Sequence, residues 1–169
     1  RHTTRRFRGD PYIFDVSSAD LQVMSAKENN AYKGVEMQRT MALANITGLD
    51  FPLLIDIYRL ATVGEKLYDM PFYYQGHVNG TNFNYTHKND LTPMGDKYGY
   101  QHIWLEAAGK SNGNLNQMSW FNGSRFFSVS TAAEKEDSLI FIRLGANDKE
   151  YHLRRDGAYM VRRTAIGGT

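Results

Sequence analysis

The stretch VEMQRTMAL, residues 35–43, decides the fold class. Its apolar side chains at positions 35, 37, 41 and 43 share one face with Arg39, while the polar positions 36, 38 and 40 share the other. A period of two places alternate side chains on opposite faces of a β-strand, whereas a helix repeats its apolar face every three to four residues. The stretch therefore predicts a strand that buries one face.

Similar signals recur on both sides of this stretch. NNAYKG, residues 29–34, predicts a hairpin loop because Asn and Gly tolerate left-handed backbone. FPLLIDIYRLA, residues 51–61, favours a strand buried on both faces, with a short helix as the alternative. About nine strands are expected, over residues 12–16, 21–28, 35–43, 51–61, 68–75, 100–109, 125–133, 138–146 and 158–165. Because no helical stripe exceeds about three turns, the sequence predicts an all-β fold, an antiparallel β-sandwich or barrel.

The composition fits one folded domain with a sizeable core. The chain has 169 residues, of which 41% are hydrophobic and 22% charged, and its aromatic content of 13% favours sheets. A net charge of +2 is too balanced to indicate a nucleic-acid binder. The absence of Cys excludes disulfides, thiolate metal sites and a Cys nucleophile, and no apolar run is long enough to span a membrane.

The stretch YDMPFYYQGHVNGTNFNY, residues 68–85, combines aromatic side chains with a His set among Asn and Gly. Four interpretations stay open: a carbohydrate platform, a nucleic-acid stacking surface, a catalytic pair of Tyr73 or Tyr74 with His77, or a strand followed by a turn. Pro71 lacks a backbone donor, which favours a sheet edge or a bulge.

The His residues give no metal-ligand spacing, because no two stand at i, i+2 or i, i+4. A site assembled from distant residues is the remaining alternative. The five are His2, His77, His87, His102 and His152.

One strand carries a candidate binding face. Its other face would carry Ile103, Leu105 and Ala107. The candidate face either stacks on a sugar or a base, or is the second buried face of a central strand. Its residues are Tyr100, His102, Trp104 and Glu106. Glu106 and Asp69 could in principle act as a glycosidase pair, but solvated or salt-bridged carboxylates are commoner.

Arg and Asn residues supply further candidates. LRRD (153–156) and VRR (161–163) hold paired Arg, which are solvated on an edge or bind carboxylates in a cleft. Arg1, Arg5, Arg6 and Arg8 form either a solvated terminus or an anion-facing loop. Four Asn-x-Ser/Thr triplets, weak evidence for glycosylation, begin at Asn45, Asn79, Asn84 and Asn122.

Several blocks occur in an order that resembles the C-terminal sheet domain of the oligoalginate lyases, within the heparinase II/III-like superfamily. Nearly the whole chain takes part, and GYQHIWLEA and RLGAND…LRRD are the most specific blocks. The others are SADLQVMSAKENNAY, VEMQRTMAL, YDMPFYYQGHVNGTNFNY, LTPMGDKYGYQHIWLEAAGK, MSWFNGSRFFSVSTA and LIFIRLGANDKEYHLRRDGAYMVRR.

The resemblance implies an N-terminal α/α toroid followed by an antiparallel β-sandwich, in enzymes that cleave alginate by β-elimination. The catalytic Asn-His and Tyr of the family belong to the toroid, and its metal ligands, for a structural divalent metal such as zinc, precede the region matched here. Residues 1–169 are thus expected to be a single sandwich domain, truncated at both ends, without the toroid. No catalytic or metal-binding residue is assigned in this chain, no cofactor is expected in it, and substrate-binding residues stay unknown.

Two functions follow as hypotheses. The first is the sheet-domain portion of an alginate or oligoalginate lyase. In this hypothesis the chain is a scaffold, and the enzyme acts on a uronate-containing acidic polysaccharide or oligosaccharide. By resemblance that enzyme is periplasmic or secreted, forms a homodimer, and binds neither nucleic acid nor membrane. The alternative is a stand-alone carbohydrate-binding β-sandwich without enzymatic activity, favoured by the aromatic content and by the face of His102 and Trp104.

Overall fold

The computed structural model describes residues 9–149 and 157–166, which form twelve strands and one short 3₁₀ helix. The chain divides into two compact units, of which the first ends at Lys66 and the second spans Leu67–Ile166. All the strand pairings described are antiparallel. The predicted all-β antiparallel fold is confirmed. The single domain expected over residues 1–169 stays a prediction, and each unit is described by itself.

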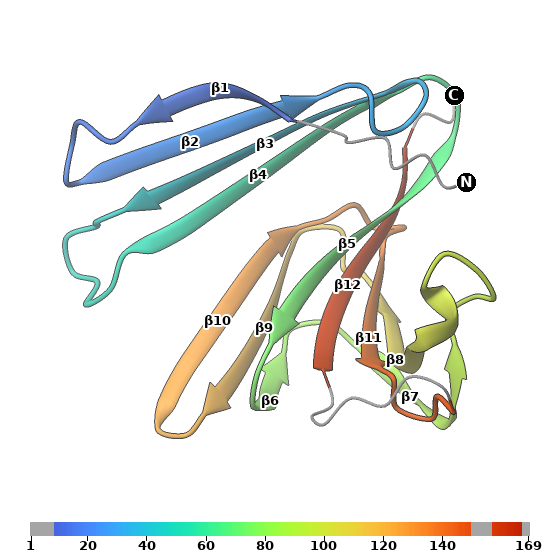
Figure 1. Ribbon diagram of the computed structural model, residues 1–169. Helices are drawn as coiled ribbons and strands as arrows, with labels where there is room; N and C mark the ends of the chain where they lie inside the picture. The colour runs from blue at the N-terminus through green and yellow to red at the C-terminus, as the bar shows by residue number, and fades with distance from the viewer. Residues whose placement is uncertain (1–8, 150–156, 167–169) are drawn as a thin grey trace. The chain divides into compact units, whose positions relative to one another are not determined.

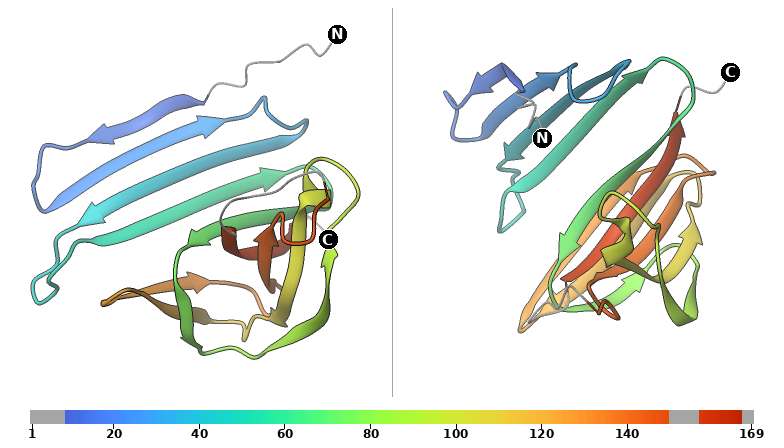
Figure 2. Two further views of the ribbon diagram at one scale, coloured as in Figure 1. Left: turned by 60° about the horizontal axis from the view of Figure 1, so that its bottom comes forward. Right: turned by 45° about the vertical axis from the view of Figure 1, so that its right-hand side comes forward.

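The first unit is a four-stranded meander in the order β1-β2-β3-β4. Figures 1 and 2 show these strands side by side in one layer. Its strands are β1 (Asp10–Asp15), β2 (Leu21–Glu28), β3 (Val35–Ala44) and β4 (Leu53–Thr62). The stretch 35–43 is thus a strand, as its alternation predicts, and residues 29–34 connect β2 to β3 as a hairpin.

The strand predicted over residues 51–61 is confirmed as β4, but its predicted burial on both faces is wrong. Leu54 is 58% exposed and Ile57 59% exposed, although they point to opposite faces of the strand. The described strands of this unit form one four-stranded sheet, so the unit supplies no second sheet to cover either face of β4. A continuous apolar run reports the tendency to be buried but not the presence of a covering layer.

The second unit holds two sheets that enclose one core, which is a sandwich arrangement (Figure 1). The larger sheet has the order β5-β12-β11-β8-β7, and the smaller has the order β10-β9-β6. Their strands are β5 (Lys66–Tyr74), β6 (His77–Thr81), β7 (Tyr85–Pro93), β8 (Ile103–Lys110), β9 (Leu115–Asn122), β10 (Arg125–Ala132), β11 (Ser138–Leu144) and β12 (Gly157–Ile166).

The core between the sheets is built from both of them. The larger sheet contributes Leu139, Phe141 and Met160, and the smaller contributes Met118 and Trp120. We call the face of the larger sheet that points into this core its inner face. Side chains from each sheet thus exclude water from the other, as in two-layer β-proteins.

The outer face of the larger sheet has its own apolar cluster. Ile140, Ile142 and Val161 lie there, each next in sequence to an inner-face residue. Met94, from the segment between β7 and β8, packs on this cluster. That segment ends in the 3₁₀ helix η1 (Tyr100–His102) and covers part of the outer face.

Twelve strands are present in the described residues where about nine were expected, and the three missed strands are β6, β7 and β9. β6 has the sequence HVNGT and β7 has YTHKNDLTP, in which polar and turn-forming residues outnumber apolar ones. Their backbone pairs with β9 and β8 respectively. Long-range pairing therefore overrides weak local strand preference.

Leu139→Ala is expected to destabilise the second unit by about 2–5 kcal/mol, because Leu139 is 0% exposed in the core and truncation leaves a cavity. The matched control is Leu115→Ala, since Leu115 is 56% exposed on β9 and should change stability by less than about 0.5 kcal/mol. Chemical denaturation followed by Trp fluorescence measures both, because Trp104 and Trp120 lie in this unit. Equal effects of the two substitutions would contradict the two-sheet core.

Candidate functional site

The aromatic stretch 68–85 forms strand β5, a turn and strand β6, and it crosses from the larger sheet to the smaller. Phe72 and Tyr74 point into the core, where their rings lie 5.5 and 6.1 Å from the ring of Trp120. Tyr73 points to the outer face, 5.0 Å from the ring of Tyr159. The interpretation as a strand followed by a turn is confirmed, and the edge position indicated by Pro71 is confirmed by the place of β5 in the sheet.

The turn after Tyr74 explains why a glycine stands there. Gly76 has a φ of 108°, and a Cβ on it would lie 2.0 Å from the carbonyl oxygen of Phe121. No other residue fits so close to a neighbouring strand. His77 follows at the start of β6, with its ring 5.4 Å from that of Phe121.

Tyr74 is poorly suited to be a proton-abstracting base in this structure. Burial raises the pKa of its phenol, the charge of Glu106 raises it further, and Arg143 lowers it in part. The phenol is therefore protonated at neutral pH, whereas a general base must be available in its deprotonated form. Tyr74 instead serves the core.

The predicted face of Tyr100, His102, Trp104 and Glu106 is wrong as a single surface. Tyr100 and His102 belong to η1, and β8 begins only at Ile103. The reason is that Gly99, with a φ of 94°, turns the chain into the helix just before the strand. His102 Nδ1 pairs with the carboxylate of Asp148, whereas Glu106 pairs with Arg143.

Trp104 and Glu106 do share a local environment. Trp104 stands opposite Arg143 in the register of β8 and β11, and Arg143 donates to Glu106 over 2.8 Å. Arg143 lies two residues after Phe141, on the inner-face side. The carboxylate is thus held in an ion pair.

Asp69 lies on the opposite side of the same sheet, so it cannot act with Glu106 as a glycosidase pair. Asp69 alternates with Phe72 and Tyr74 and therefore points outward. Of the two commoner alternatives, solvated or salt-bridged, the structure shows the second for both carboxylates.

The outer face holds a three-residue cluster of Asp69, Arg163 and Tyr100. Arg163 binds the Asp69 carboxylate with two bonds of 2.6 and 2.7 Å, and the Tyr100 hydroxyl donates to it over 2.5 Å. Burial raises the pKa of Asp69, but the hydrogen bonds from Arg163 and Tyr100 and the charge of Arg163 outweigh it, so the pKa is lowered overall. Burial, followed by the bond to Asp69, raises the pKa of Tyr100, which stays a donor.

The paired Arg of residues 161–163 form hydrogen bonds within this chain. Arg162 donates to Asp137 over 2.7 Å and to the carbonyl of Ala132 over 2.7 Å, while Arg163 binds Asp69. Both therefore bind carboxylates of this chain. The stretches RHTTRRFR and LRRD, with His2 and His152, lie outside the described residues.

The His residues are dispersed in the structure. His77 is on β6, His87 lies on β7 beside the Tyr85 ring, and His102 is on η1. No three His, Asp or Glu side chains come together to hold a metal ion in residues 9–149 and 157–166. Among these same residues, no helix has the length and apolar character needed to cross a bilayer.

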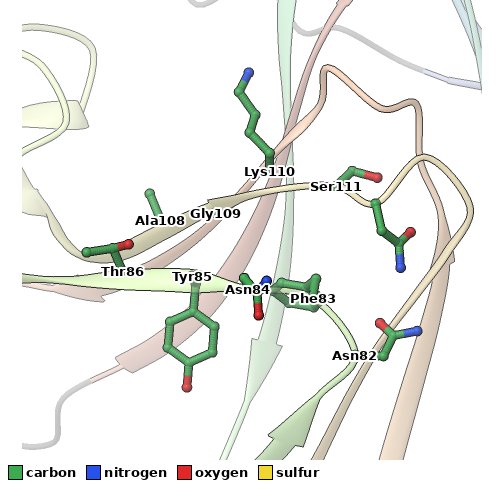
Figure 3. A pocket seen from close by; sticks show the side chains of 10 residues that line it. Asn82, Phe83, Asn84, Tyr85, Thr86, Ala108, Gly109, Lys110 and Ser111 are labelled. Atoms are coloured by element: carbon green, nitrogen blue, oxygen red, sulfur yellow. The ribbon is translucent and has the colours of Figure 1, made fainter.

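The Asn of the four glycosylation triplets lie in different surroundings. The side chain of Asn45 donates to the carbonyl of Ala19 over 2.7 Å, and Asn79 and Asn122 are exposed on β6 and β9. Asn84 lines a cavity of ≈ 450 Å³ in the second unit (Figure 3). Glycosylation itself stays a prediction.

This cavity, which we call the polar pocket, was missed by sequence reasoning. It forms where the β6–β7 turn meets the end of β8 and the turn that follows it. The lining residues are Asn82, Phe83, Asn84, Tyr85, Thr86, Ala108, Gly109, Lys110, Ser111 and Asn112. The available signal was the two Asn in each turn, at positions 82 and 84 and at positions 112 and 114. Only the pairing of β7 with β8 brings the two turns together.

A close backbone contact forms the floor of the polar pocket. A Cβ on Gly109 would lie 2.1 Å from the carbonyl oxygen of Asn84, so β7 and β8 can meet there only at a glycine. Figure 3 shows Lys110 and Tyr85 projecting to opposite sides of these strands. Tyr85 packs against the core on its side of the strands.

Asp69→Asn is expected to flatten the dependence of stability on pH. Because the folded pKa of Asp69 is lowered, its ion pair stabilises the fold above the unfolded pKa of about 3.9, and this stabilisation is lost as the pH falls through the folded value. The stability difference between wild type and variant should therefore be largest near neutrality and shrink in acid. Denaturant unfolding at a series of pH values measures it.

The matched control is Asp90→Asn, which removes an exposed carboxylate on β7. It should follow the wild-type pH profile. If Asp69→Asn follows that profile as well, the cluster does not stabilise the fold in the way described.

Two curated proteins are similar to this chain over most of its length. It is 34% identical over 143 residues to the exo-oligoalginate lyase of Saccharophagus degradans, an alignment that covers 82% of this chain and 19% of the relative. It is 32% identical over 150 residues to the alginate lyase of Stenotrophomonas maltophilia, covering 88% of this chain and 20% of the relative.

No protein-family model matches the chain. The chain spans about a fifth of the length of the curated relatives it matches. Within that span, the sequence identity shows a distant relation to alginate lyases.

Proposed function

We propose that this chain is the sheet-domain portion of a polysaccharide lyase of the heparinase II/III-like type, which cleaves alginate or oligoalginate by β-elimination. The single observation that carries the proposal is the identity of 32–34% with two alginate lyases over 82–88% of the chain. In this proposal residues 1–169 act as scaffold, and the residues that abstract and return the proton lie elsewhere in the longer enzyme.

The chemistry of the described side chains supports a scaffold role. β-Elimination on a uronate needs a group that neutralises the carboxylate, a base for the C5 proton and an acid for the leaving oxygen. The strongest candidates for these roles are engaged elsewhere, since Arg143 binds Glu106 and Arg163 binds Asp69. Tyr74 is buried and protonated. These groups hold the sandwich together.

The remaining parts of the proposal follow the same relation. The substrate is a uronate-containing acidic polysaccharide or oligosaccharide, and a structural divalent metal such as zinc, if present, would be bound by residues outside this chain. We further propose a periplasmic or secreted location and a homodimer for the longer enzyme. The alternative, a stand-alone carbohydrate-binding β-sandwich, predicts sugar binding without any elimination by a longer protein.

A β-elimination assay separates these proposals. We expect the 169-residue chain to release no unsaturated product from alginate oligosaccharides, measured by ultraviolet absorbance, because Tyr74 is buried in the core and Arg143 and Arg163 are held in ion pairs. A longer protein that carries this chain together with its upstream sequence is expected to release that product. Activity of the chain alone would contradict the scaffold role, and variants of Tyr73, His77 and His102 would then be tested first. Inactivity of the longer protein would contradict the lyase proposal.

A further inference from the structure

We propose that the polar pocket binds one uronate unit of an acidic oligosaccharide, with the Lys110 ammonium receiving the sugar carboxylate and the Asn84 and Thr86 side chains receiving its hydroxyls. The choice of sugar rests on the proposed function, whereas the place of binding rests on the pocket itself.

The wall of the polar pocket is held rigidly by hydrogen bonds. Both ends of the Asn82 side chain are used, since its Nδ2 donates to the carbonyl of Leu115 over 2.9 Å and its Oδ1 accepts from the amide of Gln117 over 2.7 Å. This fixes the β6–β7 turn against β9. A site whose supporting shell is held in this way loses little freedom when a ligand binds.

The opposite wall is built around two buried polar side chains. Asn116 is 1% exposed, and it donates to Ser111 Oγ over 2.8 Å. Its Oδ1 accepts from the amide of Asn112 over 3.1 Å. Ser111 Oγ in turn donates to the carbonyl of Ala133 over 3.4 Å. The turn after β8 is thereby set in one conformation.

Other lining groups keep hydrogen-bonding capacity for a ligand. Within residues 9–149 and 157–166, the side chains of Asn84 and Thr86 have no hydrogen-bond partner. Lys110 Nζ makes one bond of 2.8 Å, to the carbonyl of Glu136, although an ammonium has three donors. The polar pocket thus combines a fixed frame with uncommitted amide, hydroxyl and ammonium groups.

Charge and size select the class of ligand. Among the residues that the structure describes, the lining holds one cation, Lys110, and no carboxylate, so a single negative charge is balanced there. A volume of ≈ 450 Å³ lies within the usual range of small-molecule sites, about 300–1,000 Å³. A phosphate binds best where several cations or a cluster of backbone amides surround it. An apolar ligand would leave the side-chain amides of the pocket without hydrogen-bond partners. A polyhydroxylated monoanion matches both the single positive charge and the uncommitted hydrogen-bonding groups of the lining.

The test is a titration of the whole 169-residue chain with a trisaccharide of mannuronate, followed by amide ¹H–¹⁵N NMR. Shifts are expected to concentrate in residues 82–86 and 108–112, at millimolar sugar. Neutral maltotriose, which has the hydroxyls but no carboxylate, should bind at least about tenfold more weakly, since loss of a charge-assisted hydrogen bond costs roughly one decade in affinity.

Two lysine variants separate the polar pocket from general charge attraction. Lys110→Ala should weaken binding of the uronate trisaccharide at least about tenfold, and Lys110→Arg should retain most of it. Lys88→Ala, which removes an exposed lysine on β7 outside the polar pocket, should leave affinity unchanged. Because Lys110 is exposed, the variants should keep the wild-type spectrum away from the site.

The outcomes distinguish this inference from the proposed function. Shifts outside these residues, no shift at all, equal binding of maltotriose, or equal weakening by Lys88→Ala would each overturn the uronate site. The titration measures binding only, so its result does not depend on whether the longer protein is a lyase. Inactivity of the longer protein toward alginate, with binding here intact, would overturn the lyase proposal and leave the site standing.

Discussion

The apolar layer between the two sheets of the second unit is the constraint on which the rest of the structure depends. Met118 and Trp120 from β9 meet Leu139 and Phe141 from β11, and all four are buried. Burial of such side chains contributes roughly 1.5–3 kcal/mol each. This layer fixes which face of each strand points inward, because a slip of one residue would expose the whole set.

The polar groups of the second unit follow from that choice of face. On the outer face, Asp69, Arg163 and Tyr100 join β5, β12 and the segment before β8. Arg162, which points to the other side of β12, binds Asp137 in the turn before β11. A half-buried carboxylate is tolerated only when donors surround it. These groups therefore support the fold.

The first unit shows the opposite balance. Its four strands form a single layer, and large apolar side chains such as Phe14 and Leu54 are exposed. Hydrogen-bonded pairing holds the layer together through β2 and β3, and Arg39 binds Asp56 across β3 and β4. The relation to alginate lyases covers most of the chain, and the ligand site that we propose, the polar pocket, lies in the second unit.

Local sequence determined the strands with clear alternation, including residues 35–43, and it determined the turns at Asn and Gly, because these signals act between near neighbours. It favoured solvated or salt-bridged carboxylates at Asp69 and Glu106 over a glycosidase pair, and left the choice between these two open. Only the tertiary structure decided that these carboxylates lie on opposite faces, that Tyr100 and His102 belong to a 3₁₀ helix, and that β6, β7 and β9 exist. The polar pocket belongs to this second group, since Asn84 and Lys110 are distant in sequence and meet only through the pairing of β7 with β8. The physical reason is that pairing and burial are long-range interactions, which no local pattern records.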